Sequence, residues 1–382
     1  MRDQDYEALK AEWQKEWNEK GEKYAKAVND MVAFAEVHGW DAYKGEDAVD
    51  EREGVTQLCE AVFELLKEAN ERGETVKFRA DFPPSNVIFD KKLRKKLRDI
   101  DQICPLGGEN VLFIASNDDG KTLYLLEGDC VSEVADDVIA VGKSKRNEIY
   151  ALLNQDEVWL IRGYDGKSGG ELVARFSHEL EIIYDEAEIL PFNDGSKVLL
   201  VAHDGIFLIS QSGAKLIHPT YEDEGEDEDE YELEIAMANA TISNDNELIV
   251  AGEQDTDEHV LMDREGERLG GIGAQSSYPH FCLFSADDTQ LITNSCHFYN
   301  GVTIGVDRAL LKRGLEVGFY DPDGSDEQNF TLIDDAMRVY AGVATQDFYI
   351  LGDAYGYIKA VGKDGRKIWR HYLGGTIKSM AL

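Results

Sequence analysis

Near its C-terminal end the chain alternates apolar and polar residues on both sides of an Asp-Gly turn, in the stretch GYIKAVGKDGRKIWRHYLGG. Side chains that alternate with a period of two point to opposite faces of a β-strand. An Asp-Gly pair between two such stretches is typical of a tight hairpin turn, because glycine adopts positive φ without steric cost. The pattern therefore predicts a β-hairpin.

The same hairpin pattern recurs upstream. Clear copies are VWLIRGYDGKSGGELVARF, GIFLISQSGAKLI and HVLMDREGERLGGI, and weaker copies are TLYLLEGDCVSEV and VTIGVDRALLKRGLEVGFY. The turn glycines of the six copies are Gly128, Gly166, Gly213, Gly266, Gly314 and Gly365. Successive turn glycines are 38, 47, 53, 48 and 51 residues apart, so the hairpin belongs to an internal repeat.

A second pair of apolar segments lies between successive turns. NEIYALLN, SKVLLVAHD and NELIVAGEQ fill one slot, and weaker strands such as DVIAVGKS and EAEILPFND precede them. Four short strands in about 40–50 residues, with no helices between them, are typical of a β-propeller blade. Because one blade cannot cover both of its apolar faces, blades stack around an axis. We predict a mainly β fold with a β-propeller over residues 100–382.

The last repeat contains the motif DGRKIW, with Asp364, Gly365 and Trp369, ahead of YLGG. In this motif and in its four-stranded repeats, region 100–382 resembles the broad WD40-like and PQQ-like propeller superfamily. The other repeats lack the Trp, and none carries the Gly-His and Trp-Asp pairs of true WD40 repeats. The resemblance implies a fold but no ligand, because propellers host many unrelated functions. We therefore expect no cofactor.

Six turn glycines favour six blades. The final stretch GGTIKSMAL resembles the innermost strand of one further blade. It either pairs into the first blade and closes the ring, or begins a truncated seventh blade. We expect closure with six.

The first hundred residues differ from the rest. Residues 3–37 show helical spacing of apolar side chains, and GVTQLCEAVFELLKEANERG predicts a second helix that stops at Gly73. After a proline breaker, a third and strongly basic helix would carry Leu93, Leu97 and Ile100. Residues 1–99 therefore predict a helical arm or cap that packs on the propeller.

Charge is the strongest compositional feature, with 39 basic and 76 acidic residues and a net charge of −37. Residues 1–100 account for −5 and residues 101–382 for −32. Such a body repels nucleic acid and anionic membranes and attracts basic partners. The basic stretch KKLRKKLR matches a nucleic-acid patch, but we expect it to meet acidic blades of the same molecule.

No apolar run approaches the length of a membrane span, and the N-terminus is charged from its third residue. The five cysteines are widely spaced and odd in number, which favours reduced thiols over disulfides. These features predict a cytoplasmic protein, and we expect a monomer.

The densest charged segment is YEDEGEDEDEYELE. A block of like charges is normally solvated, and it often serves as an interaction segment. We expect this loop to bind a basic protein surface. The predicted partner-binding residues are Tyr221, Glu222, Asp223, Glu224, Glu226, Asp227, Glu228, Asp229, Glu230 and Tyr231.

Two groups of residues are candidates for metal binding. The stretch YDPDGSDEQ gathers oxygen ligands suited to Ca²⁺, although it lacks the order of an EF-hand loop; these are Asp321, Asp323, Asp326 and Glu327. If residue 280 lies opposite residue 296 in a hairpin, His280, Cys282 and Cys296 share one face and could hold zinc. An inter-blade turn and ordinary core packing are the competing interpretations.

Catalytic motifs are missing from the sequence. It contains no GxSxG elbow, HExxH motif, P-loop or Rossmann fingerprint. We expect a non-catalytic propeller that binds a partner protein through an acidic surface, such as an immunity or antitoxin protein that neutralises a basic toxin domain. The alternatives are a generic scaffold or sensor propeller, and a propeller hydrolase or lyase whose site at the channel mouth is invisible to motifs.

Overall fold

The computed structural model describes residues 3–39, 42–45, 48–52, 56–83, 99–108, 110–117, 120–128, 130–180, 187–219, 235–297, 300–311, 317, 329–373 and 376–382. The chain forms two compact units. The first comprises Met1–Arg98 together with His371–Gly374, and the second comprises Asp99–Arg370 together with Gly375–Leu382.

The first unit is helical. It contains α1 (Asp3–His38), α2 (Thr56–Glu71) and the short α3 (Thr75–Asp81). The first two helices confirm the predicted ones, and α3 is additional. Trp17 is buried, and its indole N–H donates a hydrogen bond of 2.7 Å to the carbonyl of Pro83. Within the described residues, no helix combines the length and the apolar character that crossing a bilayer requires.

The predicted third helix is wrong at its end. Ile100 lies in strand β1 (Asp99–Pro105) and pairs with Ala115 of β2 (Val111–Asn117). Backbone pairing with β2 determines the structure here, which the local helical spacing does not reveal. Leu93 and Leu97 lie outside the described residues.

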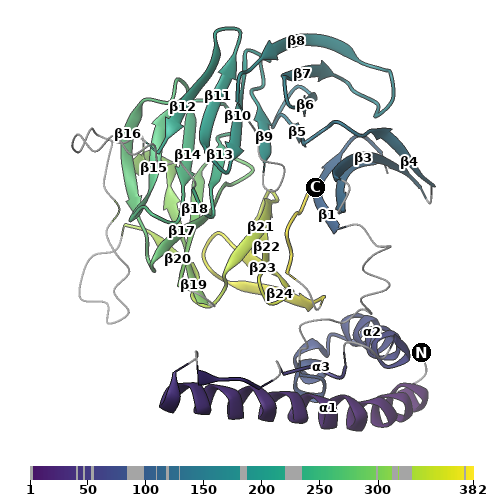
Figure 1. The fold of residues 1–382 in the computed structure, drawn as a ribbon. Coiled ribbons are helices and arrows are strands. Elements are labelled where there is room, and N and C mark those ends of the chain that lie inside the picture. Colours follow the sequence, from purple (N-terminus) through teal and green to yellow (C-terminus); the bar gives the residue numbers. More distant parts are fainter. Residues whose placement is uncertain are drawn as a thin grey trace. The chain divides into compact units, whose positions relative to one another are not determined.

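The second unit is a six-bladed β-propeller. Six four-stranded antiparallel sheets form a ring, and each sheet uses four consecutive strands (Figure 1). This confirms the predicted fold class and the favoured blade count. The remaining elements are β3 (Gly120–Glu127), β4 (Cys130–Ala135), β5 (Ala140–Lys143), β6 (Ile149–Leu153), β7 (Glu157–Arg162), β8 (Glu171–Ser177), β9 (Glu188–Pro191), β10 (Lys197–Ala202), β11 (Gly205–Ser210), β12 (Gly213–His218), β13 (Asn239–Ile242), β14 (Leu248–Gly252), β15 (Glu258–Asp263), β16 (Arg268–Gly273), β17 (Tyr278–Phe284), β18 (Gln290–His297), β19 (Asn300–Asp307), α5 (Arg308–Leu311), β20 (Thr331–Asp334), β21 (Val339–Ala344), β22 (Phe348–Asp353), β23 (Tyr357–Gly362) and β24 (Lys367–Tyr372).

The apolar core lies between neighbouring blades. Every residue of β10 is buried, whereas most of the outermost strand β8 is exposed or half-buried. Leu153 and Val158 of the second blade pack in one cluster with Ile189 and Leu200 of the third. Stacking thus buries the sheet faces that a single blade would leave in water.

The glycines of the repeat lie at the turns between the third and fourth strands. Gly128 and Gly365 have φ values of +57° and +79°, in the left-handed region that glycine adopts readily. At Gly365 the neighbouring backbone is also close, because a Cβ there would collide with the carbonyl oxygen of Leu332 in the fifth blade. The turn glycine Gly314 lies outside the described residues.

The C-terminal stretch is not a strand of a seventh blade. Residues 376–382 carry no strand, and they connect the last blade to the first. The Ile377 N–H donates to the carbonyl of Asp353 in the sixth blade, at 3.2 Å. The N–H of Ile103 in β1 donates to Ser379 Oγ at 3.3 Å. The ring therefore closes through side-chain and backbone contacts of this tail.

Candidate functional site: the two faces of the propeller

The direction of the strands places the connections on two opposite faces of the ring. Because neighbouring strands of a blade are antiparallel, the connection from the second to the third strand lies at the same end as the passage to the next blade. The connections from the first to the second strand and from the third to the fourth lie at the other end. Each face can therefore be described by its own set of connections.

The first face is strongly acidic. Among the described residues, its connections contain nine Asp and Glu residues and one basic residue, Arg338. We name this set the acidic face. It comprises the connections 118–119, 136–139, 154–156, 178–187, 203–204, 219–238, 253–257, 274–277, 298–299, 335–338 and 354–356.

The opposite face has a more balanced charge. Among the described residues, its connections contain 11 acidic and 7 basic residues. We name this set the latched face, for the hydrogen bonds described below. It comprises the connections 106–110, 128–129, 144–148, 163–170, 192–196, 211–212, 243–247, 264–267, 285–289, 308–330, 345–347 and 363–366.

The two acidic segments predicted as sites belong to different connections of the sequence. The predicted partner-binding residues 221–231 fall between β12 and β13. The candidate calcium ligands Asp321, Asp323, Asp326 and Glu327 fall between β19 and β20. Both groups lie outside the described residues.

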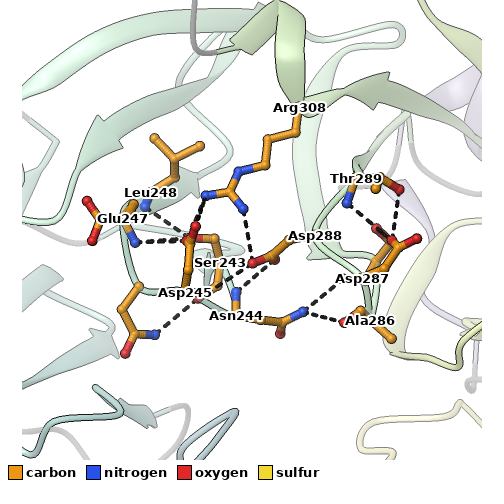
Figure 2. A network of polar contacts seen from close by, with 12 residues as sticks. Ser243, Asn244, Asp245, Glu247, Leu248, Ala286, Asp287, Asp288, Thr289 and Arg308 are labelled. Carbon is orange, nitrogen blue, oxygen red and sulfur yellow. Dashed lines mark hydrogen bonds and ion pairs between the residues drawn. The ribbon is translucent and has the colours of Figure 1, made fainter.

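A chain of asparagine and aspartate turns links successive blades on the latched face (Figure 2). Asn193 N–H donates to Asn246 Oδ1 at 2.5 Å, and Asn193 Nδ2 donates to the carbonyl of Asn244 at 2.8 Å. Asn244 in turn donates through its N–H to Asp288 Oδ1 at 2.8 Å, and Asp245 N–H donates to Asp288 Oδ2 at 3.0 Å. Each turn thus binds the next blade, and the third, fourth and fifth blades are held together.

An ion-pair network reinforces this chain. The Arg308 guanidinium donates to both oxygens of Asp245 at 2.6 Å and lies 3.0 Å from Asp288 (Figure 2). Burial disfavours the ionised form of Asp245, but hydrogen bonds from Arg308 and Ser243 outweigh burial and lower the pKa of its carboxyl. These acids have partners inside the molecule, so their role is structural.

A similar pair lies between the fifth and sixth blades. Lys363 Nζ donates to Asp287 Oδ1 at 2.6 Å. Burial disfavours the ionised form of Asp287, yet the hydrogen bonds that it accepts, from Lys363 first, lower the pKa of its carboxyl. Acids of the latched face are thus repeatedly neutralised by neighbouring blades.

Histidines gather at the acidic face. Every histidine between residues 99 and 370 lies in one of its connections or within three residues of one; they are His178, His203, His218, His259, His280 and His297. Burial lowers the pKa of His259 to about 3 and of His218 and His280 to about 4. These three side chains are therefore neutral at pH 7 and add no positive charge to this face.

The channel mouth on the acidic face carries three β-bulges. The first strands of the first, fifth and sixth blades are irregular at Asp101, His280 and Tyr340, each within three residues of the start of its strand. Bulges redirect a side chain, and they are common beside functional sites. The rings of His280 and Tyr340 meet edge to face at 4.7 Å, and Arg338 Nε donates to His280 Nε2 at 3.3 Å. The one basic residue among the described acidic-face connections is thus held against the first strand of the fifth blade.

The proposed zinc ligands do not share one face of a hairpin in the expected register. Because of the bulge at His280, Cys296 lies opposite Tyr278, and Cys282 lies opposite Thr293. Cys282 is buried, and burial raises the pKa of its thiol; its Sγ lies 3.6 Å from the carbonyl of Val250. Within the described part of the chain, no group of three or more His, Cys, Asp or Glu residues is arranged to hold a metal ion.

Sequence reasoning missed the contrast between the faces, although one signal for it was present. Once four strands per repeat are assigned, alternate connections can be counted separately, and the difference in charge between the two sets follows from the sequence. The hydrogen bonds between blades on the latched face could not be predicted from the sequence in this way. Asn193, Asn244 and Asp288 read as ordinary turn residues until the ring brings their blades together.

No family model and no curated protein matches the chain. Among solved structures, it is similar to the crystal structure of the computationally designed Ika8 protein, at 15% sequence identity and a TM-score of 0.42. That similarity covers 75% of this chain and 91% of the designed one.

Proposed function

We propose that this propeller binds a basic partner protein through its acidic face. The observation that carries the proposal is the charge contrast between the two sets of connections, which among the described residues is 9 acidic to 1 basic on one face and 11 to 7 on the other. A surface of one sign attracts a partner of the opposite sign and accelerates its association.

Exposure of the acids on this face supports the proposal. Asp136, Asp137, Asp255 and Asp335 are exposed, so a partner can reach their carboxylates. On the latched face, by contrast, Asp288 is buried and bound to the neighbouring blade. These four carboxylates of the first face are therefore available for contact, whereas Asp288 of the second face stabilises the ring.

A protein inhibitor would use such a face well. Electrostatic steering raises association rates to about 10⁸–10⁹ M⁻¹s⁻¹ at low salt, and an inhibitor benefits from fast capture. We therefore propose an immunity or antitoxin role against a basic toxin domain as the specific form of this function. A rigid six-bladed ring would present the acids without a large ordering cost.

The test compares matched neutralisations of the two faces. A basic protein that co-purifies with the chain from its native host is the probe, and its association rate is measured by stopped flow at low salt. The acidic-face variant carries three substitutions: Asp136→Asn, Asp255→Asn and Asp335→Asn. The latched-face control carries Glu148→Gln, Glu247→Gln and Asp347→Asn, all at exposed positions.

We expect the acidic-face variant to associate about tenfold more slowly, within the range that electrostatic steering spans. The control variant should associate at nearly the wild-type rate. Equal slowing in both variants would mean that only total charge matters, which contradicts a dedicated face.

A further inference from the structure

The tail that closes the ring, residues 376–382, binds the sixth blade through backbone and hydroxyl groups. The Ile377 N–H donates to the carbonyl of Asp353 at 3.2 Å. Thr376 Oγ1 donates to the carbonyl of Ala354 at 3.0 Å. Asp353 ends β22 and Ala354 begins the next connection, so the blade holds both acceptors in place. The tail thus follows two successive carbonyls of the sixth blade.

The sixth blade also leaves space for the side chain of Ile377. A Cβ at Gly352 would collide with Cγ2 and Cβ of Ile377, at 2.5 and 2.6 Å. Gly352 does not have a positive φ, so the backbone conformation alone does not require glycine there. A glycine within a strand often marks a place where another segment approaches closely. A side chain at Gly352 would therefore push the tail away from the sixth blade.

The first blade supplies the other side of the site. The N–H of Ile103 in β1 donates to Ser379 Oγ at 3.3 Å. We name Gly352, Asp353, Ala354 and Ile103 the closure site. Three of its contacts are made by backbone groups and the fourth by a missing side chain. The site therefore fits any chain that presents Thr-Ile-x-Ser in the backbone conformation of the tail.

The tail is held less firmly than the blades hold one another. Leu283 and Ile292 of the fifth blade, for example, pack in one buried cluster with Val339 and Tyr349 of the sixth. The tail forms no strand, and its Leu382 is 70% exposed. Ordering a segment costs conformational entropy, which a few contacts must offset. We therefore expect the tail to leave its site more readily than a strand leaves its ladder.

We propose that two copies of this chain exchange tails, so that the tail of one copy fills the closure site of the other. A second copy carries the same Thr-Ile-x-Ser segment, and exchange of an identical segment requires no new contacts. An attached tail acts at an effective concentration in the millimolar range. Exchange should therefore occur at high protein concentration, or when the attached tail is weakened. The proposal does not depend on the acidic face, because no charged side chain makes the contacts of the closure site.

Complementation between two variants tests this proposal. Ile377→Ser weakens the tail and leaves the closure site intact, whereas Gly352→Ala fills the site and leaves the tail intact. Each variant alone should be monomeric. An equimolar mixture should contain a several-fold larger fraction of dimer, because the tail of the second variant fits the site of the first. Sedimentation velocity at about 0.15 M salt, which screens the repulsion between acidic copies beyond about 8 Å, measures the dimer.

Lys378→Ser is the matched control, because Lys378 is the exposed neighbour of Ile377 in the tail. Its mixture with Gly352→Ala should stay monomeric, since the attached tail still fills its own site. Should a variant fail to fold, the wild-type chain with millimolar peptide GTIKSMAL, which copies residues 375–382, still decides. Hydrogen exchange should then show lost protection of the Ile377 amide and retained protection of the Ile103 amide. The same peptide with Ser in place of Ile should leave Ile377 protected.

Three outcomes would overturn the proposal. One is an equal fraction of dimer in the test mixture and in the control mixture. Another is unchanged protection of the Ile377 amide at millimolar peptide. The third is displacement of the tail by the peptide without mixed dimers, which would show that the closure site accepts a free peptide but not a second copy of this chain.

Discussion

The two faces of the propeller use acidic residues in different ways. On the latched face, Asp245 and Asp288 accept backbone and guanidinium hydrogen bonds that join one blade to the next. On the acidic face, residues such as Asp136 and Asp335 are exposed. A net charge of −37 therefore combines structural acids with acids that remain available for contact.

The comparison teaches that charge alone does not identify a binding surface. A carboxylate that accepts several hydrogen bonds within the fold stabilises the fold, and its charge is largely neutralised locally. An exposed carboxylate adds little stability but contributes to the long-range field. Whether an acid has hydrogen-bond partners within the fold therefore indicates whether it stabilises the fold or is available to a binding partner. Substitutions can test this distinction.

Among the substitutions, the largest effect is expected at Arg308 on the latched face. Its side chain is 10% exposed and neutralises Asp245 and Asp288. Replacing Arg308 with Met leaves two partly buried carboxylates without their cation, which should lower the free energy of unfolding by about 3 kcal/mol. Urea denaturation followed by circular dichroism measures this change.

Arg162→Met is the matched control for that substitution. Arg162 forms an exposed ion pair with Glu171, with side-chain exposures of 48% and 71%. Its loss should change the free energy of unfolding by less than about 1 kcal/mol. An equal decrease in the free energy of unfolding for both variants would contradict a structural role specific to the ion pairs of Arg308 with Asp245 and Asp288.

A change of pH should reveal an acid sensitivity of the acidic face. His218, His259 and His280 have folded-state pKa values of about 4, 3 and 4, below the ordinary value of 6.5. Below pH 6.5 the unfolded chain therefore binds more protons than the folded chain. Stability should fall as the pH drops from about 6.5 towards 4, by on the order of 1 kcal/mol per pH unit for each histidine.

The latched face responds at lower pH. The pKa of Asp194 lies at about 2, because hydrogen bonds from Ser196 and Arg264 outweigh its burial, so it stays ionised until well below pH 3.8. Hydrogen exchange at pH 7 and pH 5, corrected for intrinsic rates, should show opening at the acidic face first. His280→Asn, which can still donate to the carbonyl of Val339, should reduce the pH dependence. Simultaneous opening of both faces would contradict the assignment.

The smallest effect concerns the stability of the acidic face itself. Neutralising Asp136, Asp255 and Asp335 together should change the free energy of unfolding by no more than about 0.5 kcal/mol at each position, because exposed positions contribute little. Thermal unfolding by calorimetry measures the change. A loss of several kcal/mol would show that these acids are structural after all.

The repeat could be predicted well from the sequence. The contacts between strands and between blades that form only in the folded ring could not. Alternating strands and turn glycines such as Gly128 and Gly365 are local features, and they sufficed for the propeller and its blade count. Ile100 was assigned to a helix because its partner Ala115 lies in the next strand of the blade. The bulge at His280 shifted the register on which the zinc hypothesis rested.

The most direct test of the account is the hydrogen-exchange footprint of the basic partner that co-purifies with the chain. The account predicts that binding protects backbone amides in connections 136–139, 203–204, 253–257 and 335–338. Amides in 144–148, 243–247 and 285–289 should keep their exchange rates. Protection confined to the latter three connections would contradict the assignment of the acidic face as the binding surface.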